Sequence, residues 1–187
     1  MSTIKVENLT GLTSGSNANK IIIPSGQTID ASAGTLVPSA GAVMQVVESV
    51  RTVWTSTATT YFVSTGLSVV ITPSATSSKI ILMGNMNGTY TAAATAYHQF
   101  KLYRNASDHG WITSNYGQEN SAISGGHTSN YGQSLSWSWL DSPSSTSAQT
   151  YELFFRTPTG GTVGYNNYDA NGNNTTRSGI IAWEIAG

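Results

Sequence analysis

Two stretches in the C-terminal half of the sequence alternate between large apolar and polar residues, and they constrain the fold more than any other feature. Over residues 135–139, Leu, Trp and Trp alternate with serine, and a second alternation over residues 151–156 follows a polar connection. A period of two residues is typical of a strand with one face in a core and the other in water. The two stretches therefore predict two strands, with Trp137, Trp139, Leu153 and Phe155 as core residues.

From residue 42 onward the chain reads as further strands separated by turns. Apolar or alternating runs lie at residues 44–54, 67–71, 80–86, 96–104, near 111, at 162–165 and at 179–185. No window shows a convincing helical period. About eight or nine short strands at this spacing are typical of an antiparallel sandwich. We therefore predict an all-β fold whose head, residues 42–187, is an antiparallel jelly-roll-like β-sandwich.

Residues 1–41 have a different character, because their apolar residues are scattered among Thr, Ser, Gly and Asn. Pro24 and Pro38 interrupt this segment, and turns are expected at residues 24–26 and 33–34. A segment of this size does not bury enough apolar surface to fold alone. We expect an extended fibrous stalk that folds against copies of itself in a trimer, and the alternative is a flexible leader.

The composition limits the classes of partner. Charged residues make up 9% of the chain, against roughly a quarter in a typical soluble protein. Uncharged polar residues must therefore cover the surface, as is common on extracellular and virion β proteins. The formal net charge of −1 offers no basic field to nucleic acid or anionic lipid. We expect no nucleic acid and no membrane among the partners.

Cysteine is absent, so neither a disulfide nor a thiolate metal site contributes to stability. No apolar signal-peptide core follows Met1, and the longest aliphatic run, at residues 21–23, is far shorter than the ~20 residues that cross a bilayer. We therefore expect a protein made in the cytoplasm without a signal peptide.

Five blocks of sequence occur in order along almost the whole chain. They are Ile-Ile-Ile-Pro-Ser-Gly-Gln-Thr-Ile-Asp-Ala-Ser-Ala-Gly-Thr-Leu at 21–36, Ile-Thr-Pro-Ser-Ala-Thr-Ser-Ser-Lys-Ile at 71–80, Phe-Lys-Leu-Tyr-Arg at 100–104, Leu-Asp-Ser-Pro at 140–143 and Trp-Glu-Ile-Ala-Gly at 183–187. Together these blocks resemble a family of short bacteriophage tail-fibre or virion structural proteins.

The resemblance implies a homotrimeric fibre in the virion. Its N-terminal part, residues 1–41, would attach to other virion proteins, and its C-terminal head would be similar to the trimeric jelly rolls of the tumour necrosis factor class. Such a protein is made in the host cytoplasm and then built into the particle.

Two polar segments are candidate binding sites for carbohydrate. Ser-Asn-Tyr-Gly-Gln occurs at residues 114–118 and again at 129–133, and a second Tyr- and Asn-rich segment spans residues 165–174. Tyrosine stacks on sugar C–H groups while amides bond the hydroxyls. The candidate contacts are Asn115, Tyr116, Gln118, Asn130, Tyr131, Gln133, Tyr165, Asn166, Tyr168 and Asp169. The alternative is that these tyrosines pack on the sheet, as many loop aromatics do.

Metal binding and catalysis find little support in the sequence. Asp169 with its neighbouring asparagines offers oxygen ligands, but the spacing matches no calcium loop. His98, His109 and His127 lack metal-ligand spacing, and no nucleophile elbow or phosphate-binding glycine loop occurs. The few acids are dispersed, so a glycosidase pair is not evident. We expect no cofactor, no metal and no enzymatic activity.

Three functions remain, in order of preference. The first is a virion fibre protein, attached by its N-terminus, whose head adheres to the host surface and there binds a polysaccharide. The second is a purely structural virion component, which decorates or joins parts of the particle without touching the host. The third is a hydrolase of surface glycan. Sequence does not separate the first two, because both need a polar head on a stalk.

Overall fold

The computed structural model describes residues 14–15, 25–26, 38–91, 98–111, 133–158, 160–166 and 176–187. The chain divides into two compact units, residues 1–37 and 38–187. All ten regular elements in the described ranges are β-strands, and they belong to the second unit. The prediction of an all-β antiparallel fold is confirmed, because every strand pair in these ranges is antiparallel.

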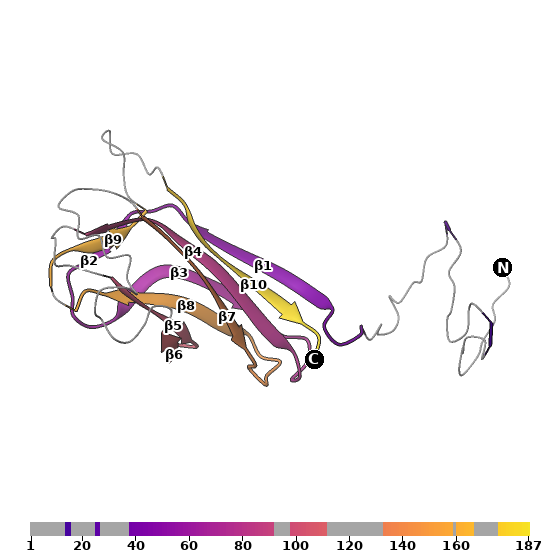
Figure 1. Cartoon of the computed structure of the whole chain (residues 1–187). Coiled ribbons are helices and arrows are strands. Elements are labelled where there is room, and N and C mark those ends of the chain that lie inside the picture. Colours follow the sequence, from indigo (N-terminus) through magenta and orange to yellow (C-terminus); the bar gives the residue numbers. More distant parts are fainter. Residues whose placement is uncertain are drawn as a thin grey trace. The chain divides into compact units, whose positions relative to one another are not determined.

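The strands form two sheets, which lie one above the other in Figure 1. The first sheet has six strands in the order β1-β10-β4-β9-β2, and β7 pairs with β4 outside this path. Its strands are β1 (Val43–Arg51), β2 (Thr55–Thr57), β4 (Lys79–Thr91), β7 (Gln133–Asp141), β9 (Val163–Tyr165) and β10 (Ser178–Ile185). The second sheet has four strands in the order β3-β8-β5-β6. Its strands are β3 (Val63–Ile71), β5 (Gln99–Arg104), β6 (Ser107–Trp111) and β8 (Gln149–Arg156).

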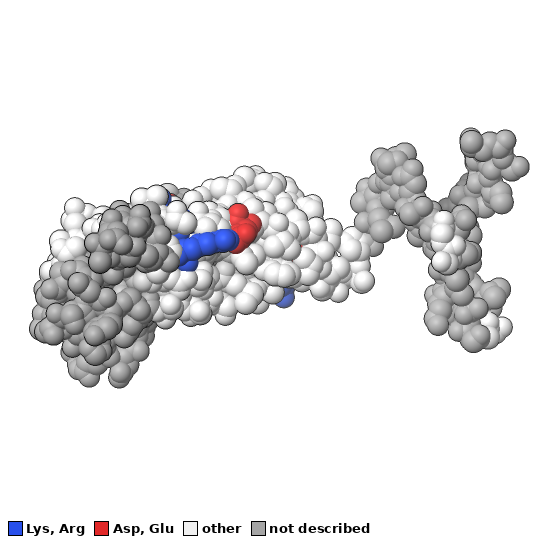
Figure 2. Space-filling view, turned by 90° about the horizontal axis from the view of Figure 1, so that it is seen from above, with Lys and Arg blue, Asp and Glu red and all other residues white. Residues whose placement is uncertain are grey.

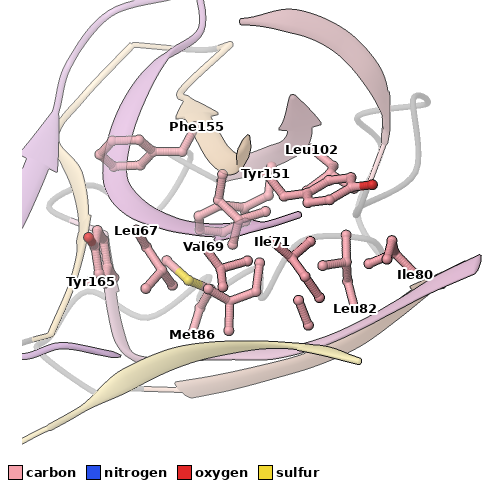
Figure 3. Packing of buried hydrophobic residues seen from close by; sticks show 14 of the residues in the cluster. Leu67, Val69, Ile71, Ile80, Leu82, Met86, Leu102, Tyr151, Phe155 and Tyr165 are labelled. Atoms are coloured by element: carbon pink, nitrogen blue, oxygen red, sulfur yellow. The ribbon is translucent and has the colours of Figure 1, made fainter. Parts of the chain in front are cut away.

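The core lies between the two sheets and is built by strict alternation along the strands. In β8 and β10 every second side chain is buried, as expected for strands with one face in a core. Figure 3 shows side chains of both sheets meeting there. The buried apolar residues are Leu67, Val69, Ile71, Ile80, Leu82, Met86, Phe100, Leu102, Tyr151, Leu153, Phe155, Val163, Tyr165, Ile180 and Ala182. The prediction that Leu153 and Phe155 are core residues is confirmed.

Trp137 and Trp139 agree with the prediction in part, because they pack against the core but are only partly buried. The reason is their strand: β7 pairs only with β4 and so lies at an edge. Both indole rings lie over glycine. A Cβ added to Gly84 would lie 2.4 Å from the Trp137 ring, and one added to Gly110 would lie 2.4 Å from the Trp139 ring. Because Gly110 belongs to β6, Trp139 bridges the β7 edge of the first sheet and the β6 edge of the second sheet.

Candidate functional site

The first sheet has one surface in the core and one that points away from the second sheet, which we call the outer face. It comprises the outward side chains of β1, β10, β4 and β7. The strand registers align Val46 with Trp183, Trp183 with Ile81, and Ile81 with Leu140. Residues opposite each other on neighbouring strands share a face. An unbroken apolar row therefore crosses all four strands of the outer face.

The next two rows of the outer face continue this apolar character in part. One row aligns Glu48, Ile181, Met83 and Ser138, and the following row aligns Val50, Gly179, Asn85 and Ser136. Leu140 is 60% exposed, Val46 and Met83 are each 50% exposed, and Val50 is 40% exposed. Contiguous apolar patches of this kind are uncommon on monomers and mark interaction surfaces. The outer face is therefore the strongest candidate for a functional surface among the described residues.

An open groove of 620 Å³ crosses the outer face at these two rows. Its lining combines the apolar Met83 and Ile181 with the polar Asn85 and Ser136. At its side Arg177 Nη2 lies 2.7 Å from Glu48 Oε1, and both side chains are more than half exposed. Figure 2 looks down on the molecule, and its described surface is almost entirely white, apart from one blue and one red group in contact and a smaller blue patch at its lower edge. The groove therefore lies on a surface with very little charge.

A buried carboxylate, that of Glu184, forms hydrogen bonds on the inner side of the first sheet. Glu184 is fully buried on β10, and its Oε1 accepts hydrogen bonds from Ser74 N (2.6 Å), Ser74 Oγ (2.6 Å) and Ser78 Oγ (2.7 Å). Gln45 Nε2 donates to Oε2 at 2.6 Å. Burial opposes ionisation, but these hydrogen bonds outweigh it and hold the pKa of Glu184 at about 2, below its ordinary value of 4.5. The carboxylate thus ties β1, β10 and the β3–β4 loop together.

A second polar cluster joins the two sheets at the end of β7. Asp141 accepts hydrogen bonds from Tyr151 Oη (2.6 Å), Arg104 Nη1 (2.8 Å) and Ser142 N (2.8 Å). His109 Nε2 lies 3.1 Å from Asp141 Oδ1. Burial opposes ionisation of Asp141, but the hydrogen bonds from Tyr151 and Arg104 lower its pKa below the ordinary value. Because Asp141 lies on the first sheet and its side-chain partners on the second, the cluster is a structural link between the sheets.

The predicted glycan contacts Tyr165 and Asn166 are part of the interior. Tyr165 is fully buried, and its hydroxyl donates to Thr65 O at 2.5 Å. Asn166 is fully buried as well, and its Nδ2 donates to Arg51 O at 2.9 Å while its Oδ1 accepts from Ser178 Oγ at 2.7 Å. Tyr165 and Asn166 are therefore removed from the set of predicted glycan contacts, because neither side chain is available to a ligand. The burial of Tyr165 agrees with the alternative that the tyrosines of these segments pack on the sheet.

The other predicted contacts are not brought together by the described part of the chain. Gln133 begins β7, and the remaining positions lie outside the described residues: Asn115, Tyr116, Gln118, Asn130, Tyr131, Tyr168 and Asp169. Their assignment to a glycan site stays a prediction.

The outer face was not identified from the sequence, although one signal for it is present. The segment Gly-Ile-Ile-Ala-Trp-Glu-Ile at residues 179–185 carries large apolar residues at both odd and even positions. Near-continuous apolar runs are typical of strands covered on both faces. In β10 the core covers one of these faces, and the other contributes Ile181 and Trp183 to the outer face. This composition is therefore the sequence signal for a strand that is apolar on both faces.

Within the described ranges, no group of three or more acidic or histidine side chains is placed to hold a metal ion. No helix in the same ranges is long and apolar enough to cross a membrane. A search of protein-family models and a search of curated proteins both gave no match to this chain.

Proposed function

We propose that this chain is the subunit of a homotrimeric bacteriophage virion fibre. Residues 1–41 attach it to other virion proteins, and the β-sandwich head is displayed for adhesion to the host surface. The observation that carries the proposal is the outer face, because its unbroken apolar row suits a subunit whose sheet is covered in an assembly. The five sequence blocks that resemble phage virion proteins support the particle as the place of that assembly.

The proposed ligand of the head is a neutral surface polysaccharide. The chain has a net charge of −1 and few charged residues, so attraction rests on stacking and hydrogen bonds and not on long-range charge. Tyr116 and Tyr131, in the two copies of the repeated segment, would stack on sugar rings. Three copies in each trimer would raise weak single-site binding through avidity. The protein would act as a binding module and not as an enzyme.

The alternative is a structural component enclosed by other virion subunits. The outer face favours this function equally well, because an apolar sheet surface also suits a joint between different subunits. The position of the chain in an imaged particle separates the two. A head at a distal tip agrees with adhesion, and a head surrounded by other subunits contradicts it.

The trimer is tested by sedimentation equilibrium of the purified full chain. We expect a mass of three times 19.7 kDa at micromolar concentration. A folded species with the mass of a single chain at that concentration contradicts the proposed trimeric fibre.

Adhesion is tested by replacing Tyr116 and Tyr131 together with alanine. We expect adsorption to host cells or to extracted surface glycan to fall by roughly tenfold or more, since stacking of each aromatic ring contributes on the order of 1 kcal/mol. Adsorption of the unaltered protein should weaken only slightly as salt rises. Tyr61→Ala is the matched control, because Tyr61 is a 67% exposed tyrosine outside both repeats. Equal adsorption of the double variant and the control would remove these loops from the binding site.

A further inference from the structure

The outer face of one copy is suited to pack against the outer face of a neighbouring copy. We propose that the β1 edge of each subunit packs over the β4–β7 half of its neighbour, so that Val46 and Val50 of one copy meet Met83 and Leu140 of the other. This inference rests on the proposed trimer and specifies the surface that closes it.

The layout of the sheet fits a closed ring. A ring of three identical subunits has heterologous interfaces, in which two different parts of the surface meet. In this part of the sheet the strands follow the order β1, β10, β4 and β7, so β1 and β7 form opposite edges. Each edge carries exposed apolar residues, Val46 and Val50 on β1 and Leu140 on β7. The groove over β10 and β4 lies between them and receives the β1 edge of the neighbour.

Charge favours a second copy over a charged partner. The described ion pair on the outer face, Arg177 with Glu48, is already made within one chain. Beyond this pair the described outer face carries one further charge, the exposed Lys79 of β4, which lies opposite Ile185. The face therefore offers little charge to complement an acidic or basic protein, whereas most of it matches another surface that is equally apolar. The chain as a whole has a net charge of −1, so repulsion between copies is small.

The number of outward residues sets how much of a subunit interface the outer face can supply. The strands β1, β10, β4 and β7 contain nine, eight, thirteen and nine residues. Since every second residue of a strand points to one face, each copy presents about twenty outward residues. In a ring these residues are divided between two interfaces, about ten on each side, whereas standard interfaces use roughly 20 to 30. The outer face would therefore supply only part of each interface.

The test is Val46→Glu in the full chain, with Val70→Glu as the matched control. Both are valines on edge strands, with exposed fractions of 50% and 51%, but Val70 lies on β3 in the second sheet. A carboxylate at residue 46 would be buried without a partner in the proposed interface. We expect the concentration for half-assembly to rise by roughly a hundredfold or more for Val46→Glu, and to stay within about threefold for Val70→Glu.

The result separates this inference from the proposed function. If the unaltered chain is itself a monomer, the trimeric fibre is wrong, and the inference fails with it. If the unaltered chain is a trimer and Val46→Glu assembles equally well, only the inference is overturned, and residues 1–37 or another surface hold the trimer together.

A second variant decides the matter if Val46→Glu does not fold. The chain lacks cysteine, and Val46→Cys with Leu140→Cys introduces two small apolar side chains. Within one copy the two positions lie three strands apart, roughly 14 Å, which is too far for a disulfide. Oxidised glutathione, which takes up the two electrons of each bond, should therefore link three copies into a covalent trimer. Covalent trimers from Val70→Cys with Leu140→Cys instead, or none from the test pair, would overturn the inference.

Discussion

Replacing Glu184 with alanine is expected to lower the free energy of unfolding at pH 7 by roughly 3 to 5 kcal/mol. The side chain is fully buried and accepts four hydrogen bonds, from Ser74, Ser78 and Gln45. Its removal takes the acceptor from the Ser74 and Ser78 donors, while Gln45 Nε2 keeps Thr72 O as an acceptor, and it releases the β3–β4 loop from β10. Urea unfolding of purified variants measures the loss.

The same carboxylate predicts a pH dependence with a definite sign. The pKa of Glu184 is about 2 in the folded protein, and its ordinary value, which applies to the unfolded chain, is 4.5. The contribution is therefore fully present above pH 4.5 and is lost as the pH falls toward 2. The difference between the two pKa values corresponds to about 3 kcal/mol, similar to the cost expected for alanine.

Two comparisons isolate this contribution. Glu184→Gln keeps the shape of the side chain but cannot ionise, so its stability deficit relative to the unaltered protein should shrink between pH 5 and pH 2. Glu48→Ala removes a half-exposed carboxylate from the same sheet and should cost less than about 1 kcal/mol, as exposed ion pairs do. A deficit of Glu184→Gln that stays constant over this pH range would contradict the assigned pKa.

Asp141→Ala is the second substitution with a large expected effect, again roughly 3 to 5 kcal/mol. Asp141 is buried on β7, and its loss leaves the buried hydroxyl of Tyr151 and the guanidinium of Arg104 without their acceptor. Because these partners lie on the second sheet, the sandwich loses a link between its layers. The measurement is thermal or urea unfolding at pH 7.

Asp108→Ala is the control for Asp141→Ala. Asp108 forms an ion pair with Lys101 on the second sheet, but its side chain is 46% exposed, so its loss should cost less than about 1 kcal/mol. Similar losses for Asp141→Ala and Asp108→Ala would mean that the cluster does not link the sheets.

The pKa of Asp141 is lowered in the folded state, so its contribution to stability is present above its ordinary pKa of 3.8 and declines at lower pH.

The strands could be predicted from the sequence because alternation is a local property, but the pattern does not say which face of a strand meets the core. In β10 Ile181 and Trp183 point outward, while Ile180, Ala182 and Glu184 point inward. A strand that is apolar on both faces leaves this choice open, and partners distant in sequence decide it. The donors to Glu184 from Ser74 and Ser78 lie more than a hundred residues away.

The candidate site was less accessible to sequence reasoning than the strands, for a related reason. Tyr165 and Asn166 lie in a Tyr- and Asn-rich segment, a composition that surface loops and buried polar networks share. Their burial depends on Thr65, Arg51 and Ser178, which the fold brings to them from other strands. The outer face likewise emerges only when the registers of four strands are aligned. Composition identifies polar and apolar residues. Which of them are buried, and which align in rows across one face of a sheet, depends on the topology.

The position of β10 has a consequence for the synthesis of the protein. β10 is translated after the other nine described strands, yet it lies between β1 and β4 and pairs with both. While a nascent chain has not yet reached residue 178, β1 and β4 have no strand between them, and their edges are open to other chains. Such pairing between distant strands forms slowly. A polypeptide interrupted before Ser178 would lack the middle of the outer face, and with it part of the surface that we propose for the assembly.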